Sequence, residues 1–147
     1  MSRFRRGAVA CLVASLLLGL GAMHASAQTV FGEKLGFVAR NNSNQNNVMG
    51  TGWVRATLDG MTLVVVGEFE NLGSMATAAH IHLAPPGQHG PVVFPLEFTA
   101  GTSGTLSGTF ELTEALLAEL MAVNLYVNVH SELSPRGVIR AWLVPVE

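Results

Sequence analysis

Two alternating segments joined by a short turn constrain the fold of this chain more than any other feature. Between residues 53 and 58 apolar and polar side chains alternate, so the apolar ones would share one face of a strand. Asp59-Gly60 then supplies the turn chemistry of a tight β-hairpin, and residues 61–70 return as a run rich in β-branched side chains. The sequence therefore predicts an antiparallel hairpin with one buried face.

Further short apolar runs follow along the chain, separated by segments rich in Gly, Pro and Ser. Together with a first run at residues 30–39, they lie at residues 76–83, 92–98, 105–112, 123–130 and 138–144. One short helix is expected over residues 113–121, where Thr113 can cap the N-terminus and Glu114 lies in the first turn. About seven or eight strands without strand–helix alternation predict an all-β chain, folded as a single Greek-key-like β-sandwich.

The N-terminal residues have the composition of a secretory signal peptide. Three arginines precede an apolar run over residues 8–23, and the small-residue tripeptide at residues 25–27 follows it. This order predicts a signal peptide over residues 1–27, cleaved after Ala27, and a secreted or periplasmic protein. The apolar run is shorter than the ~20 residues that span a membrane, so the mature chain, residues 28–147, is expected to form one domain without a membrane span.

Cleavage at that position changes the chemistry available to the mature chain. Cys11 is the single cysteine and lies in the predicted leader, so no disulfide, thiolate ligand or cysteine nucleophile would remain. Three of the eight Lys and Arg residues leave as well, which leaves five against ten Asp and Glu, a net charge of −5. This balance argues against nucleic acid and anionic membrane surfaces as partners.

The histidines are concentrated in two segments of the predicted mature domain. His80, His82 and His89 lie within ten residues, in the stretch "AAHIHLAPPGQHGPVVFPL", and His130 ends the apolar run at 123–130. Strand alternation places His80 and His82 on one face, and it places His130 on the face opposite the valines of its own strand. If the two strands are neighbours, the three imidazoles converge.

Such a cluster can hold a transition metal. A His-x-His pair on a strand fixes two imidazoles, a distant histidine closes the shell, and His89 on the Pro-Gly loop can add a fourth nitrogen. The predicted metal ligands are therefore His80, His82 and His130, with His89 as a further one. All-nitrogen donors suit copper or zinc, with copper favoured on intrinsic affinity. Asp59 is the single aspartate and occupies a turn, which argues against calcium.

A metal-free interpretation stands beside this one. The histidines, together with Asn124, Tyr126 and Asn128, can instead form a hydrogen-bonded polar layer that positions the Pro-Gly loop. Arg140 either pairs with a carboxylate such as Glu68 or is exposed. No nucleophile-elbow, P-loop or dinucleotide-binding motif is present, so a non-catalytic protein is expected rather than an enzyme.

Three stretches carry a resemblance to a known family: "AAHIHLAPPGQHGPVVFPL", "LSGTFELTEALLAEL" and "LYVNVHSELSPRGVIRAWL". Here the chain resembles a CHRD domain, a module named after chordin and also found singly in exported bacterial proteins, over residues 32–144. The resemblance implies an all-β sandwich, and it carries the family's histidines over to His80, His82 and His130 and its arginine to Arg140. It implies little about function. The family's Glu-Val-Pro-Pro segment is replaced here by "NNSNQNNVM".

The order of the histidines is also similar to that in copper-zinc superoxide dismutase, although the chain lacks that family's metal-bridging and zinc-loop ligands and its disulfide. Three hypotheses therefore stay open at this point. The first is an exported, non-catalytic module that binds a transition metal. The second is a metal-free scaffold for an extracytoplasmic protein or envelope component, with structural histidines. The third is a copper-dependent protein that metabolises superoxide.

Overall fold

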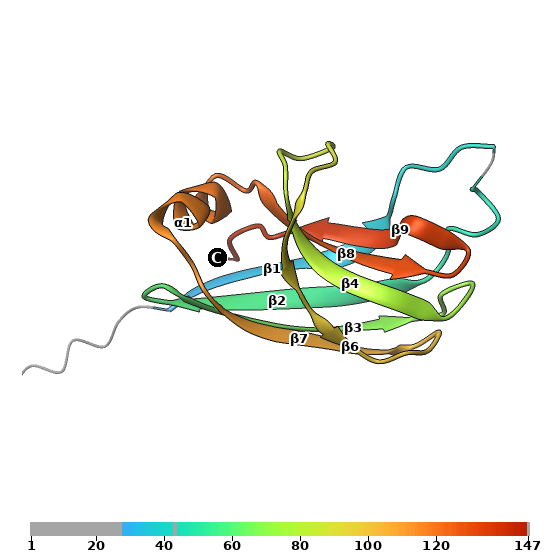
Figure 1. Ribbon diagram of the computed structural model, residues 1–147, viewed down its shortest axis with the longest axis horizontal. Helices are drawn as coiled ribbons and strands as arrows, with labels where there is room; N and C mark the ends of the chain where they lie inside the picture. The colour runs from blue at the N-terminus through green and yellow to red at the C-terminus, as the bar shows by residue number, and fades with distance from the viewer. Residues whose placement is uncertain (1–27, 43, 147) are drawn as a thin grey trace, which may run out of the picture.

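The computed structural model describes residues 28–42 and 44–146, so the predicted signal peptide lies outside the described residues. The described part is built from nine strands and one short helix (Figure 1). They are β1 (Thr29–Phe37), β2 (Thr51–Asp59), β3 (Thr62–Glu70), β4 (Ala76–Leu83), β5 (Val92–Pro95), β6 (Glu97–Phe98), β7 (Gly104–Glu111), α1 (Glu114–Met121), β8 (Leu125–Ser131) and β9 (Ser134–Trp142). The all-β prediction with one short helix is confirmed.

The strands form two layers that are joined at both edges. All pairings are antiparallel, in the order β5-β4-β8-β9-β1-β2-β3-β7-β6. Strand β1 belongs to both layers, because its first seven residues pair with β2 while Gly36 and Phe37 pair with β9. We call β5, β4, β8 and β9 the histidine layer, and β1, β2, β3, β7 and β6 the hairpin layer (Figure 1).

At the other edge, residues 92–98 pass from one layer to the other. Strand β5 pairs with β4, β6 pairs with β7, and buried Leu96 between them donates its backbone N–H to the Ala79 carbonyl at 2.9 Å. The single strand predicted at 92–98 is therefore two short strands in different layers. This division accounts for nine strands where about seven or eight were expected.

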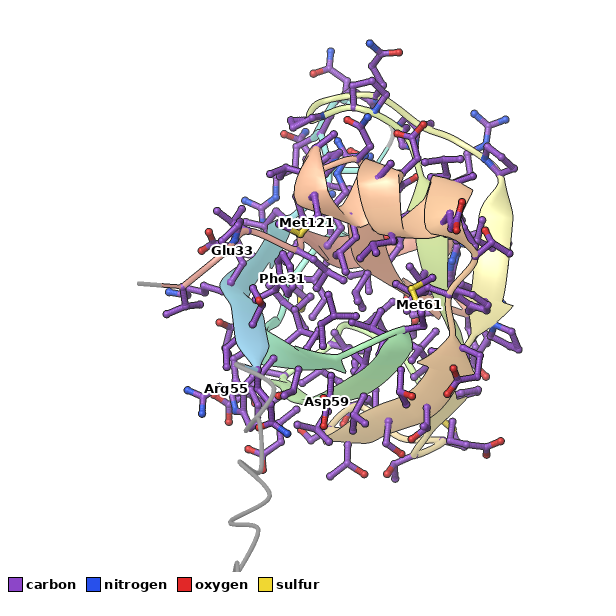
Figure 2. All side chains as sticks on the ribbon, turned by 90° about the vertical axis from the view of Figure 1, so that its left-hand side faces the viewer. Phe31, Glu33, Arg55, Asp59, Met61 and Met121 are labelled. Atoms are coloured by element: carbon purple, nitrogen blue, oxygen red, sulfur yellow. The ribbon has the colours of Figure 1, made fainter. Side chains whose placement is uncertain are left out.

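The core lies between the two layers and follows the alternation of each strand. Along β3, Leu63, Val65, Gly67 and Phe69 are buried, while Val64, Val66 and Glu68 between them face solvent. Figure 2, which looks along the sandwich from the end that carries α1, shows Phe31 between the layers and Arg55 outside them. Phe31 is fully buried. Period-two patterning is thus what divides the chain into core and surface.

The hairpin that the sequence predicts forms with a loop displaced by one residue. Asp59 pairs with Thr62, so the two loop residues are Gly60 and Met61 rather than Asp59 and Gly60. Gly60 takes the first loop position with φ of +60°, a conformation that glycine adopts without strain. The register still pairs Leu58 with Leu63, and both leucines are buried.

The helix forms where it was predicted. The Thr113 side chain accepts a hydrogen bond from the Leu116 backbone N–H at 3.2 Å, as an N-cap does, and Glu114 lies in the first turn. Leu120 is fully buried, which fixes the helix over one end of the core. No helix among the described residues is long and apolar enough to cross a membrane.

Strand β9 begins four residues earlier than predicted, within a segment whose composition is typical of a loop. Ser134 pairs with Ser131 across a two-residue turn, and exposed Pro135 is tolerated at the start of the strand. Gly137 has φ of +119°, and a Cβ there would collide with the Asn128 amide. Strand β8 also starts late, at Leu125, because Val123 has φ of +61° in the turn after α1.

Two neighbouring residues of β3 test the in–out pattern. Leu63 is fully buried, so Leu63→Ala should lower the free energy of unfolding by about 2–5 kcal/mol. Val64 is 42 % exposed on the other face, so Val64→Ala should cost no more than about 1 kcal/mol. Urea unfolding followed by circular dichroism measures both. The opposite order of effects would mean that β3 pairs one residue out of register.

Candidate metal centre

The predicted convergence of three histidines is a consequence of one strand pairing. Strands β4 and β8 are antiparallel neighbours, with His80 opposite Asn128 and His82 opposite Tyr126. His130 lies two residues beyond Asn128 on the same face. The residues that alternate with the histidines of β4 enter the hydrophobic core, so all three imidazoles emerge on the outer face of the histidine layer.

The three imidazoles lie close enough to share one ion. His80 Nδ1 is 3.2 Å from His130 Nε2, and the ring centroids are 5.0 to 5.8 Å apart. One nitrogen from each of His80, His82 and His130 lies within 4.8 Å of the others. With metal–nitrogen bonds of about 2 Å, such a triangle can close on a single ion after small side-chain movements.

Backbone carbonyls fix the tautomers of two of these histidines. His82 Nδ1 lies 2.9 Å from the Gly90 carbonyl oxygen, and His130 Nδ1 lies 3.0 Å from the Pro135 carbonyl oxygen. A carbonyl can only accept, so each Nδ1 carries the proton and donates it. Each Nε2 is therefore unprotonated and carries the lone pair, as in histidines that bind a metal through Nε2.

The lone pair of His82 has no partner. His82 is 8 % exposed, and its Nε2 forms no hydrogen bond with any residue that the structure describes. By contrast, His130 Nε2 is within 3.3 Å of the Asn128 amide nitrogen as well as near His80. A buried polar atom without a partner is costly, and a metal ion would satisfy this one. The residues present therefore fit a metal.

Burial keeps His80 and His130 in the neutral form that binds metal. Desolvation by burial lowers the pKa of His80 below its ordinary value of 6.5, and the nearby His82 lowers it further. For His130, burial lowers the pKa more than the hydrogen bond to the Pro135 carbonyl raises it, and the two neighbouring histidines lower it again. Both imidazoles are neutral at pH 7, so a metal would displace no proton from either side chain.

A strap, residues 84–91 between β4 and β5, covers part of this face. Gly90 donates its backbone N–H to the Tyr126 hydroxyl at 3.2 Å, and the Trp142 indole donates to the Ala84 carbonyl at 3.0 Å. Tyr126 also stacks on His82, with ring centroids 5.0 Å apart. Gly90 is required here because a Cβ would collide with the Leu83 carbonyl. Tyr126 thus contacts both the strap and the His82 imidazole and positions them together.

The remaining residues singled out in the sequence lie elsewhere. His89 is exposed on the strap and is not among the three clustered histidines; it lines a shallow hollow beside Arg136 and Gly137. Arg140 lies over the Trp142 ring at 4.8 Å and forms no ion pair with a carboxylate that the structure describes. Glu68 instead accepts a hydrogen bond from the Trp53 indole at 3.2 Å.

Two supporting groups of the site were not identified from the sequence, namely the carbonyls of Gly90 and Pro135. Backbone acceptors leave no signature in side-chain patterns. Both lie in Gly- and Pro-containing segments that the sequence marks as turns, and this was the one available signal.

Comparison with known proteins gives one result. A sequence model of a family described as CHRD domain matches residues 27–143, which includes every strand and all three clustered histidines. A search of curated proteins and a search of solved structures each found no match.

The lowered pKa values of His80 and His130 predict how the stability of the metal-free protein depends on pH. The unfolded chain, whose histidines titrate near 6.5, binds more protons than the folded chain as the pH falls from about 7.5 to about 5.5. The free energy of unfolding should therefore decrease over this window. Urea titrations with a chelator present measure it.

The control for this prediction is a double variant, His80→Asn with His130→Asn, whose stability should change less over the same window. Carboxylates titrate mostly below this pH window, so they contribute little to the change in the free energy of unfolding. Stability that stays constant or rises toward pH 5.5 in the original protein would contradict the effect of burial described here.

Proposed function

The chain belongs to the CHRD domain family, and from that premise we propose that it is an exported, non-catalytic protein that binds one transition-metal ion. The proposed ligands are His80, His82 and His130. Copper is the favoured ion, and zinc is the alternative. The observation that carries the proposal is the unpartnered Nε2 of buried His82, which points to a group missing from the chain itself.

The donor set supports copper over the common hard cations. The clustered ligands are all imidazoles, and calcium and magnesium prefer carboxylate and carbonyl oxygens. Among first-row divalent ions, a site of neutral nitrogen donors binds copper most tightly. His80 and His130 are only partly buried, so an ion has a path from solvent to the cluster.

Metal binding would rearrange the contacts between the histidines. The contact between His80 Nδ1 and His130 Nε2 uses a lone pair that a metal requires, so this hydrogen bond must be given up. The bonds from His82 to the Gly90 carbonyl and from His130 to the Pro135 carbonyl involve the other ring nitrogens and can persist. The bound ion would supply a positive, electron-accepting centre on the surface of the histidine layer.

Replacement of His82 tests the site directly. Chain purified without a metal-affinity tag should bind one equivalent of copper(II), with nitrogen hyperfine coupling in electron paramagnetic resonance. His82→Ala should weaken binding by about 100-fold or more, because loss of a ligand exceeds the 10–100-fold cost of losing a supporting contact. Competition titration with glycine measures the affinity. Unchanged binding in His82→Ala would refute the proposed ligand set.

His89→Ala is the matched control, since it removes an imidazole from the same segment but not from the cluster. It should retain the stoichiometry and affinity for copper. A loss comparable to that of His82→Ala would make His89 a fourth ligand. A chain that stays metal-free with copper and zinc in excess would leave the histidines a structural role and favour the scaffold hypothesis.

Export is the second part of the proposal, and it is supported by the arginines, apolar run and small residues of positions 1–27. Expressed with its full sequence in a bacterial host, the protein should appear outside the cytoplasm with Gln28 as its first residue. N-terminal sequencing and intact mass measure this. A cytoplasmic protein that retains Met1 would contradict export.

A further inference from the structure

The outer face of the hairpin layer carries a hollow that the metal proposal does not use. Its volume is about 370 Å³, within the range of about 300–1,000 Å³ typical of small-molecule sites. Residues of β2, β3, β7 and the bend before β7 line it, chiefly Trp53, Glu68, Glu70, Ser103 and Thr105. Strand register places Trp53 opposite Glu68, and Glu68 opposite Thr105, so these three form one row across the face.

Trp53 is the unusual member of this row. A tryptophan 42 % exposed on a sheet face presents a large apolar ring to water, although its neighbours are polar. The indole N–H donates to Glu68 Oε2 at 3.2 Å, so the one polar atom of the side chain already has a partner. What the ring offers to a ligand is therefore its flat apolar face.

The polar groups around the ring are acceptors and hydroxyls. Glu68 and Glu70 are successive outward residues of β3. Thr105 of the neighbouring strand β7 borders the hollow, as does Ser103, which immediately precedes β7. Among the residues that the structure describes, no Lys, Arg or His lines it. Phosphate, sulfate and acidic glycans would thus meet two carboxylates inside the hollow. The neighbouring cations, Lys34 opposite Trp53 on β1 and Arg55 two residues along β2, are not part of its lining, so the hollow disfavours anionic ligands.

We propose that this hollow binds a neutral carbohydrate. A sugar ring has an apolar C–H face that packs on an indole, and an edge of hydroxyls that donate to carboxylates. Trp53 would form the platform, Glu68 and Glu70 would accept from the sugar hydroxyls, and the Ser103 and Thr105 hydroxyls can serve as donors or acceptors. The hollow is open at the surface of a sheet, which suits a segment of an extended polysaccharide.

This site is independent of the histidine cluster. The histidines emerge from the outer face of β4 and β8, whereas the hollow lies on β2, β3 and β7 in the other layer, with the core between them (Figure 1). A chain that binds copper and no sugar, or sugar and no copper, would separate the two proposals.

Isothermal titration with cellohexaose and chitohexaose as probes tests the inference, with a heparin hexasaccharide and spermine as charged comparisons. We expect a neutral hexasaccharide to bind and heparin not to bind. Trp53→Ala should weaken binding by about tenfold or more, since stacking on an aromatic ring and its buried area are lost together. Val66→Ala, also 42 % exposed on this face, is the matched control and should stay within about twofold.

Glu68→Gln gives an independent measurement, because it keeps an oxygen that accepts from Trp53 and from a sugar hydroxyl. It should reduce binding of a neutral sugar only a few-fold. The inference is overturned if neither neutral hexasaccharide binds at millimolar concentration, or if Trp53→Ala binds as tightly as the original chain. Tight binding of spermine alone, abolished by Glu68→Gln, would also overturn it and make the hollow a cation site.

Discussion

The antiparallel pairing of β4 with β8 is the constraint on which the rest of the site depends. It sets His80 against Asn128 and His82 against Tyr126, and the same register sends Ala79, Ile81, Val127 and Val129 into the core. A slip of one residue would bury the imidazoles and expose the aliphatic side chains. The hydrophobic effect that stabilises the sandwich therefore also fixes the register that brings the three histidines together.

Backbone carbonyls, rather than side chains, set the orientation of the His82 and His130 imidazoles. The carbonyls of Gly90 and Pro135 each accept an Nδ1–H hydrogen bond, and the two residues are far apart in the chain: Gly90 lies two residues before β5, and Pro135 is the second residue of β9. The Asn128 amide connects these parts, since it contacts His130 and the Arg136 carbonyl while Gly137 leaves room for it. Two of the three clustered histidines therefore have fixed tautomers, and the buried Nε2 of His82 is left without a hydrogen-bond partner among the described residues.

Local patterns in the sequence were sufficient for the strands and for the face on which each histidine lies, because side-chain alternation depends on the backbone alone. They could not establish that β4 and β8 are neighbours, since pairing is decided by the packing of the whole sandwich. The strap over His82 and the change of layer at Leu96 also depend on long-range contacts. A single tryptophan forms no recognisable sequence motif, so Trp53 could not be predicted as part of a site. Its neighbours Glu68 and Thr105 come from other strands, and only the strand pairing brings them beside it.

The passage of residues 92–98 between the layers also limits self-association through the sheet edges. The outermost strands of the sheet, β5 and β6, are four and two residues long, and they are successive parts of one segment. A second chain would find little continuous backbone there on which to add a strand. The geometry that closes the sandwich thus also discourages edge-to-edge polymerisation. The broad faces, with the histidines on one and Trp53 on the other, are the larger surfaces left open to other molecules.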